Sequence, residues 1–257
     1  MMRTNYHTHT KRCKHAGGTE EDYVLSAIRS QLDILGFSDH APFPDRDYGL
    51  RMPYDELRPY LDAITELSET YDGKIKLLKG LEIEYLPQYH QYYENLLTKE
   101  GMDYLLLGEH FFAYGNDIFN IYSSDSTEKY LDYARAVAAA MGTGYFKAVA
   151  HPDLFLLNTF AWDKNCDKAC DIIVNEAVKT NTILEYNANG YRRGVHDFPD
   201  GSRYQYPHPE FWKRVAEAKI PVIIGSDCHN PLQVWDDFVE NAYKKLEEYG
   251  ITPMTVL

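Results

Sequence analysis

The stretch "VIIGSDCH", residues 222–229, joins a short apolar run to two potential metal ligands, Asp227 and His229. An apolar run of this length is typical of a strand that is buried on both faces, as in a parallel sheet. The reactive residues of such sheets come from the carboxyl ends of the strands and from the loops that follow. The same form recurs in "ILGFSDH" (34–40), "YLLLGEH" (104–110) and "FKAVAH" (146–151). These stretches predict a parallel sheet with a polar site at one edge.

Seven apolar segments alternate with amphipathic segments along the chain. We predict strands at 4–8, 34–38, 75–83, 104–108, 146–150, 182–186 and 222–225. Helices are predicted at 19–31, 54–69, 87–98, 126–141, 166–179, 209–218 and 232–249. The first helix begins at Thr19, a good N-cap residue that is followed by acidic residues in the first turn. This β/α repeat implies parallel strands, but its period fits an open doubly wound sheet and a closed barrel equally well.

The positions of the histidines and acids favour the barrel. Six of the seven predicted strands end in potential metal ligands, which are His7 and His9, His40, Glu82 and Glu84, His110, His151, and Asp227 with His229. The sixth strand ends instead in Glu185, Asn187 and Asn189. An open sheet would spread these ends along a line, whereas a barrel gathers them around one mouth. We therefore predict one barrel domain over residues 1–257, in which no change of composition marks a second domain.

Residues two apart on a strand face the same side, so His7 with His9, and Asp227 with His229, can reach one cavity. His15 lies in the loop beyond His9 and could fold back toward it. Imidazole and carboxylate ligands suit zinc, manganese or iron, and the number of candidates exceeds the needs of one ion. Closely spaced ions call for a bridging carboxylate, which Glu82 or Glu84 could provide.

The remaining histidines and the cysteines have plainer interpretations. We expect His90, His196 and His208 to be exposed to solvent, Cys166 and Cys170 to be structural, and Cys228 to pack in the core. Cys13 is a soft ligand that lies close to the expected site.

Composition excludes several other classes of protein. The chain has 257 residues, of which 44% are hydrophobic and 25% charged, and its formal charge is −13. This charge and the lack of a basic stripe argue against a nucleic-acid partner, and the apolar runs are too short to span a membrane. The four cysteines form neither a CxxC pair nor a disulfide framework, so we expect a cytoplasmic protein. Because neither a nucleic acid nor a membrane is indicated, we expect its partner to be a small molecule. The sequence does not predict an oligomeric state.

The ordered set "HTH" (7–9), "SDH" (38–40), "GLE" (80–82), "GEH" (108–110), "AHPD" (150–153) and "SDCH" (226–229) resembles the polymerase and histidinol phosphatase (PHP) family. The resemblance spans His7 to His229, and the length most resembles that of the stand-alone histidinol-phosphate phosphatases. It implies a distorted TIM-like (β/α)7 barrel with a trinuclear metal centre at the C-terminal mouth of the strands. The three divalent ions would be zinc, iron or manganese.

The ligand sets are what the resemblance implies. One ion would take His7, His9 and Asp227 and share Glu82 with a second ion, which also takes His110 and His151. A third ion would take His15, His40 and His229. Glu82 is chosen over Glu84 from its "GLE" context, and Asp39 is expected to orient an imidazole. Glu82, Asp227 and His229 are then expected to be catalytic.

The activity implied is hydrolysis of a phosphate monoester, L-histidinol phosphate, through attack by a metal-bridging hydroxide. Arg192 and Arg193 in "NGYRRG" (189–194) are expected to bind the phosphate, with Lys11 and Arg12 as weaker candidates. Acidic and aromatic residues of the loops could receive the cationic end of the substrate, namely Asp45, Asp47, Tyr48, Phe111, Phe112, Tyr114, Asp153 and Phe155. The alternatives are another PHP phosphoesterase acting on phosphotyrosine, a sugar phosphate or a nucleotide, an amidohydrolase, and a non-catalytic metal-binding regulator.

Overall fold

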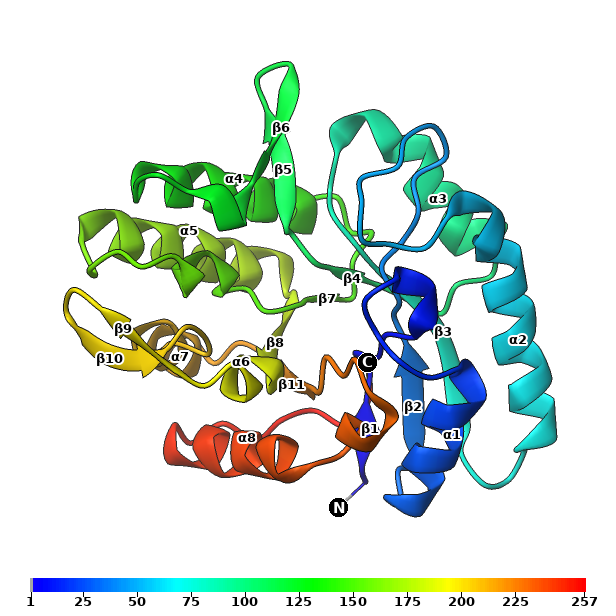
Figure 1. The fold of residues 1–257 in the computed structure, drawn as a ribbon. Coiled ribbons are helices and arrows are strands. Elements are labelled where there is room, and N and C mark those ends of the chain that lie inside the picture. The colour runs from blue at the N-terminus through cyan, green and yellow to red at the C-terminus, as the bar shows by residue number, and fades with distance from the viewer. Residues whose placement is uncertain (1) are drawn as a thin grey trace.

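A computed structural model describes residues 2–257 and has a seven-stranded parallel sheet at its centre (Figure 1). The strand order is β1-β2-β3-β4-β7-β8-β11. The strands are β1 (Thr4–Asn5), β2 (Ile34–Phe37), β3 (Lys76–Ile83), β4 (Tyr104–Leu107), β7 (Ala148–Val149), β8 (Ile183–Asn187) and β11 (Val222–Gly225). Each of them falls on a predicted strand, and every neighbouring pair in this sheet is parallel.

The first and last strands of the sheet meet just beyond their C-terminal ends. An isolated parallel bridge pairs Thr8 with Cys228, and the His9 amide donates a 3.0 Å hydrogen bond to the Cys228 carbonyl. This contact nearly closes the sheet into a barrel. The prediction of a distorted (β/α)7 barrel is therefore confirmed.

The helices of the β/α repeat lie around the outside of the barrel (Figure 1). They are α1 (Glu20–Arg29), α2 (Leu57–Thr70), α3 (His90–Thr98), α4 (Glu128–Met141), α5 (Lys164–Thr180), α7 (Pro209–Glu217) and α8 (Asp237–Glu248), with the short α6 (Asn189–Arg192) in the loop after β8. Thr19 caps α1 as predicted, in a reciprocal capping box with Asp22. The predicted starts at 54 and 87 are single 3-10 turns, Tyr54–Glu56 and Pro87–Tyr89, that lead into α2 and α3.

Two hairpins were not predicted from the sequence. β5 (Phe111–Tyr114) pairs with β6 (Asp117–Asn120) after the fourth barrel strand, and β9 (Val195–Phe198) pairs with β10 (Gly201–Tyr204) after the sixth. Apart from Phe111, Phe112 and Phe198, their residues are exposed or partly exposed, so they lack the continuous buried apolar run that identifies the barrel strands.

Side chains fill the barrel interior below the mouth. Tyr6, Ile34, Tyr104, Leu106, Ala148, Ala150 and Ile223 form one buried cluster there, and Leu257 packs against it. The Tyr104 hydroxyl donates to the carbonyls of Tyr6 and Phe37 at 2.7 and 2.9 Å. A larger apolar cluster lies between the sheet and the helices. Because the lower barrel is packed with apolar and aromatic side chains, the polar strand ends are left at the mouth.

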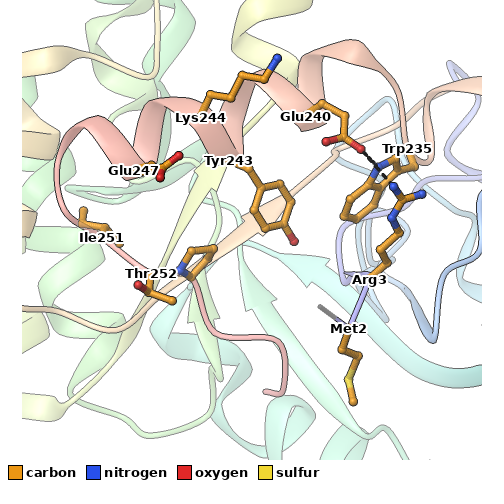
Figure 2. A pocket seen from close by; sticks show the side chains of 10 residues that line it. Met2, Arg3, Trp235, Glu240, Tyr243, Lys244, Glu247, Ile251 and Thr252 are labelled. Carbon is orange, nitrogen blue, oxygen red and sulfur yellow. Dashed lines mark hydrogen bonds and ion pairs between the residues drawn. The ribbon is translucent and has the colours of Figure 1, made fainter.

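Among residues 2–257, no helix combines the length and the apolar composition needed to cross a bilayer. A cavity of about 520 Å³ lies between the segment before β1, α8 and the residues that follow α8 (Figure 2). Its polar groups are partly paired with one another, since the Trp235 indole donates to Glu240 at 2.6 Å and Arg3 contacts the same carboxylate at 3.4 Å. None of the predicted site residues lines it.

Candidate metal centre

The predicted ligands meet at the mouth of the barrel. A cavity of about 590 Å³ opens there, and it is lined by seven of the nine candidates, His15, His40, Glu82, His110, His151, Asp227 and His229. The other two, His7 and His9, are fully buried and lie within hydrogen-bonding distance of each other, with 3.0 Å between their Nε2 atoms. The barrel therefore brings together side chains from the two ends of the sequence, from His7 to His229.

Four donor atoms form a compact cluster with the spacing of a tetrahedral metal site. The Nε2 atoms of His7 and His9 each lie 3.4 Å from Glu82 Oε2, and they lie 3.6 and 3.3 Å from Asp227 Oδ1. Ligands at about 2.0–2.2 Å from a tetrahedral ion are separated by about 3.3–3.6 Å. With the 3.0 Å between the two imidazoles, the cluster surrounds a space that fits one ion.

Glu82 directs its two carboxylate oxygens toward different histidines. Oε2 lies 3.4 Å from the Nε2 atoms of His7 and His9 and 3.0 Å from His40 Nδ1, while Oε1 lies 2.7 Å from His151 Nε2 and 3.6 Å from His110 Nε2. Oε2 is buried, and no donor among residues 2–257, His40 Nδ1 included, is oriented to make a hydrogen bond with it. A buried carboxylate oxygen without a donor is costly unless a cation neutralises it. This orientation is the one a bridging carboxylate requires.

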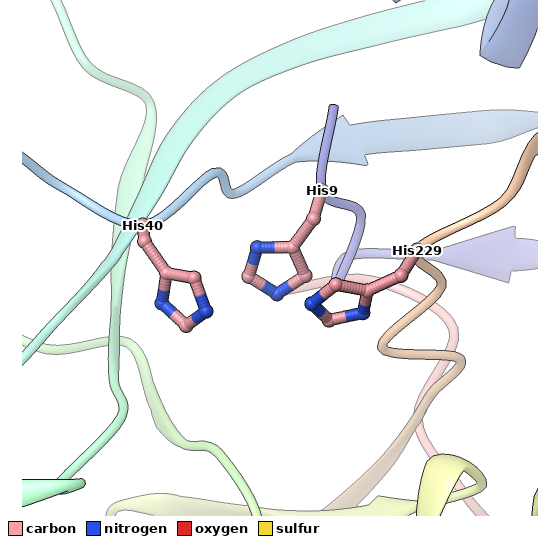
Figure 3. A group of neighbouring side chains, drawn as sticks. All are labelled: His9, His40 and His229. Atoms are coloured by element: carbon pink, nitrogen blue, oxygen red, sulfur yellow. The ribbon is translucent and has the colours of Figure 1, made fainter. Parts of the chain in front are cut away.

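A third group of imidazoles lies on the outer side of His9. Figure 3 shows His9 between His40 and His229, and its ring centroid is 4.3 Å from each of theirs. His15 closes this group, with its Nε2 atom 3.0 Å from His229 Nε2 and its ring 5.1 Å from that of His40. His9 thus contacts both the first and the third of the predicted ligand sets.

The second nitrogen of several imidazoles is held by a neighbouring acceptor. His7 Nδ1 lies 2.7 Å from Glu185, His110 Nδ1 lies 3.0 Å from Glu84, and His15 Nδ1 lies 2.8 Å from the Cys13 carbonyl. When Nδ1 carries the proton of a neutral imidazole, the Nε2 lone pair is free to bind a metal. These contacts therefore direct Nε2 into the cluster.

The sixth barrel strand supplies supporting groups. Glu185 accepts from the His151 amide at 3.0 Å and from the Asn187 side chain at 2.9 Å. Asn187 and Asn189 also donate to Asp227 Oδ2, at 3.2 and 3.1 Å. In the sequence, the three polar residues Glu185, Asn187 and Asn189 at the end of this strand are the feature that indicates a supporting role.

The surroundings of the imidazoles shift their pKa values in two opposite directions. Burial alone would lower the pKa of His9, but the nearby carboxylates of Asp227, Asp39 and Glu82 outweigh it and raise the pKa to about 9. Burial dominates for His229 and lowers its pKa to about 4. Burial would raise the pKa of Glu82, yet the adjacent histidines hold it well below its usual range. The carboxylates thus favour positive charge at the centre of the cluster, while His229 is held neutral as a ligand must be.

The donor set, the separations and the unpartnered carboxylate oxygen fit divalent metal ions. Mixed imidazole and carboxylate donors suit zinc, manganese and iron. Glu84 is not directed into the cluster, because Arg51 engages both of its oxygens. Asp39 accepts from the Thr10 amide and hydroxyl at 3.0 and 2.5 Å and lies 3.7 Å from His9 Nδ1, beside the ring it was expected to orient.

The four basic residues expected at the phosphate lie in different places. Arg193 lines the cavity, and its guanidinium lies 5.6 Å from the Tyr206 ring and 6.0 Å from the Tyr122 ring. Arg192 turns away and pairs with Asp236, and it also donates to the Ser226 and Gln233 carbonyls. Arg12 pairs with Glu20 and Glu56, and Lys11 is exposed away from the cavity lining. The geometry thus singles out Arg193, and the positions of the other three do not support phosphate contact.

Of the loop residues expected to meet a cationic substrate, Tyr48 and Phe111 line the cavity. The other six do not line it. Asp153, for example, is buried and accepts from the Trp212 indole at 3.0 Å. The sequence analysis missed Leu50, Arg51, Asn120, Tyr122, Tyr206 and Gln233, which also form the wall. They come from loops and from the unpredicted β5–β6 hairpin, where no periodic pattern marks them.

One histidine was placed wrongly from the sequence. His208 is not exposed, because it caps α7 and stacks on Trp162 with 4.6 Å between ring centroids. His90 is exposed and His196 is partly exposed. Cys166, Cys170 and Cys228 are buried in the apolar core, as expected, and Cys13 is buried near the site with its thiol 3.2 Å from the Thr10 carbonyl.

Residues 5–189 match the PHP domain, and this match covers more than half of the chain. The chain therefore belongs to the PHP family. A probable histidinol-phosphatase of Deinococcus radiodurans is 28% identical over 262 residues, which cover 95% of this chain and 92% of the relative. A histidinol-phosphatase of Bacillus subtilis is 22% identical over 260 residues, covering 89% and 94% of the two chains.

The fold is also similar to a solved structure of histidinol phosphate phosphatase from Lactococcus lactis complexed with zinc, L-histidinol and phosphate. The TM-score is 0.73 at 16% sequence identity, and the match covers 98% of this chain and 95% of that chain. This likeness confirms the TIM-like architecture.

Proposed function

We propose that this chain is a metal-dependent phosphomonoesterase that hydrolyses L-histidinol phosphate to L-histidinol and phosphate. The observation that carries the proposal is the convergence of nine imidazole and carboxylate side chains at the mouth of a PHP barrel. The names of the two relatives support the same activity. We further propose that residues 1–257 act as one domain and, since all four cysteines are free thiols, that the enzyme works in the cytoplasm.

The ligand assignment is part of the proposal. His7, His9 and Asp227 would hold one ion, and Glu82 would bridge it to a second ion that is held by His110 and His151. His15, His40 and His229 would hold a third. The four-atom cluster supports the first set, and the split orientation of Glu82 supports the bridge. Zinc is favoured by the Lactococcus lactis relative, and manganese or iron would suit the same donors.

Bound divalent ions would supply positive charge for the phosphoryl oxygens and a hydroxide nucleophile near neutral pH. The chain's own residues position the substrate and its charges. Arg193 offers a guanidinium to the phosphate from the wall of the cavity, held against Tyr122 and Tyr206. Glu185 and Glu84 keep the imidazoles of His7 and His110 in a fixed orientation, so the site needs little rearrangement when substrate arrives.

The aromatic wall of the cavity suits the rest of the substrate. Histidinol phosphate carries an ammonium group and an imidazole that can be protonated. Tyr48, Phe111, Tyr122 and Tyr206 present aromatic groups to the cavity. Aromatic faces attract cations and stack on planar rings, so this wall favours histidinol phosphate over a small anionic phosphate ester.

Phosphate release by the purified protein from histidinol phosphate, phosphotyrosine and an aryl phosphate, each with and without chelator, tests the proposal. We expect the highest kcat/KM on histidinol phosphate and loss of turnover with chelator. A preference for phosphotyrosine would point to another PHP phosphoesterase. Turnover that is insensitive to chelator, or no phosphate release from any of the three, would contradict the proposal.

A further inference from the structure

A largely buried arginine lies in the wall of the cavity beside the proposed metal centre. Arg51 belongs to the loop that follows β2, and only 5% of its surface is exposed. Its guanidinium donates to both oxygens of Glu84, at 2.9 and 3.0 Å, and to the Ala41 carbonyl at 3.2 Å. It also lies 5.0 Å from the ring of Phe111 and 5.8 Å from that of Phe43. Two aromatic rings and a two-point ion pair thus fix its position.

Glu84 connects this arginine to the metal centre. The same Oε1 atom that accepts from Arg51 lies 3.0 Å from His110 Nδ1. The other ring nitrogen of His110, Nε2, lies 3.6 Å from Glu82 Oε1. The contacts therefore run from Arg51 through Glu84 to His110, and from there to the carboxylate at the centre of the cluster.

We propose that Arg51 and Glu84 are a positioning pair, which fixes the ring of His110 with its Nδ1 proton on Glu84 and its Nε2 lone pair toward Glu82. This inference rests on the proposed metal role of His110. Neither residue is a ligand in this account. Because both oxygens of Glu84 are engaged, the pair acts on metal binding through the tautomer and orientation of one imidazole.

The burial of the pair explains why both members are needed. Glu84 is 1% exposed and lies two residues from Glu82, so without Arg51 it would add an uncompensated negative charge beside the cluster. Without Glu84, the His110 ring would lose the acceptor that selects its tautomer. Loss of such a supporting partner typically weakens metal binding by about 10–100-fold.

The test compares Glu84→Met, which removes the acceptor for His110 Nδ1, with Arg51→Met, the double variant and His110→Ala, which removes the proposed ligand itself. Arg214→Met is a matched control, since Arg214 contacts Asp167 and Asp171 on α5, outside the site. Zinc affinity and stoichiometry are measured by competition with a chromophoric chelator and by elemental analysis. The ¹⁵N shifts of the His110 ring in metal-free protein report its tautomer.

We expect each single variant to weaken the binding of one zinc ion about 10–100-fold and to leave the other sites at wild-type affinity. The double variant should bind this zinc ion at least as tightly as the more impaired of the two single variants, because both substitutions act through His110. The His110 ring should lose its fixed Nδ1-protonated form in Glu84→Met, and Arg214→Met should match wild type throughout. If a single variant is too unstable to purify, the double variant, which leaves neither charge buried and unpaired, decides through the ¹⁵N shifts.

Two outcomes would overturn the inference, and they are distinguishable. If His110→Ala loses one ion while Glu84→Met and the double variant keep full affinity and an unchanged His110 tautomer, the positioning role is wrong and the metal assignment stands. If His110→Ala itself keeps every ion, the proposed ligand set is wrong and the inference falls with it.

Discussion

Gly108→Ala should displace the central carboxylate of the metal site. Gly108 directly follows β4, at the end that reaches the mouth. A Cβ atom placed on it would lie 2.2 Å from Glu82 Oε1 and 2.5 Å from the carboxylate carbon. Non-bonded carbon and oxygen atoms need more than 3 Å, so the carboxylate would have to move by about 1 Å. Glu82 is 1% exposed and surrounded by imidazoles, so it has no free space into which to move.

The size of the effect follows from that displacement. A misplacement of about 1 Å at a catalytic group costs about 100-fold in rate. We therefore expect Gly108→Ala to lower kcat/KM for histidinol phosphate by about 100-fold and to lose at least one bound metal ion. The assays are phosphate release, elemental analysis and a thermal melt followed by circular dichroism.

The control is Gly142→Ala, at the end of α4. The nearest atom to its Cβ would be the Ala139 carbonyl oxygen at 3.4 Å, an ordinary contact, so activity and metal content should not change. Gly225→Ala is a second test, because its Cβ would crowd Glu185 rather than Glu82 and should disturb His7 indirectly. A folded Gly108→Ala protein with wild-type metal content and rate would refute the bridging role of Glu82.

Three further predictions follow from the same geometry. Arg193→Met should raise KM for the phosphate ester at least tenfold with little change in the melting temperature, whereas Arg192→Met should lower the melting temperature because it breaks the pair with Asp236. Metal removal by chelator should lower the melting temperature, since buried carboxylates lose their counter-charge; an unchanged calorimetric melt would argue against a metal centre. Burial lowers the pKa of His208 from 6.5 to about 4. Between these pH values the unfolded chain binds a proton that the folded chain does not, so the free energy of unfolding falls as the pH drops through this window, by up to about 3 kcal/mol. His208→Asn keeps a capping side chain and should reduce the difference in unfolding free energy between pH 7 and pH 4.5, as measured by urea unfolding. An unchanged difference would assign the pH dependence to the charged neighbours of His208, which are Asp200, Arg203, Glu210 and Arg214.

The sequence predicted the barrel strands because each is a short apolar run that stops at a polar residue. Strands buried on both faces leave little freedom for other assignments, and parallel strands bring their carboxyl ends to one side. The potential ligands can therefore be grouped from the sequence alone. The resemblance to the PHP family added the division into three sets, which the periodicity alone does not contain.

The supporting contacts could not be predicted, because they depend on where side chains of separate loops meet. Arg192 and Arg193 are adjacent and chemically identical, yet one pairs with Asp236 and the other lines the cavity. His208 appeared exposed because its neighbours in the sequence are polar and proline-rich, whereas it is covered by Trp162 from a distant loop. The contact between Arg51 and Glu84 likewise comes from packing between the loop after β2 and the end of β3.

The metal dependence of histidinol phosphate hydrolysis is the property on which the proposed function rests. It is tested most directly by measuring phosphate release and metal content together, on metal-depleted protein and during stepwise return of zinc. We expect no turnover without metal and a rate that rises with the metal bound, until the site is filled. Undiminished hydrolysis by metal-free protein, or no phosphate release from fully loaded protein, would contradict the account.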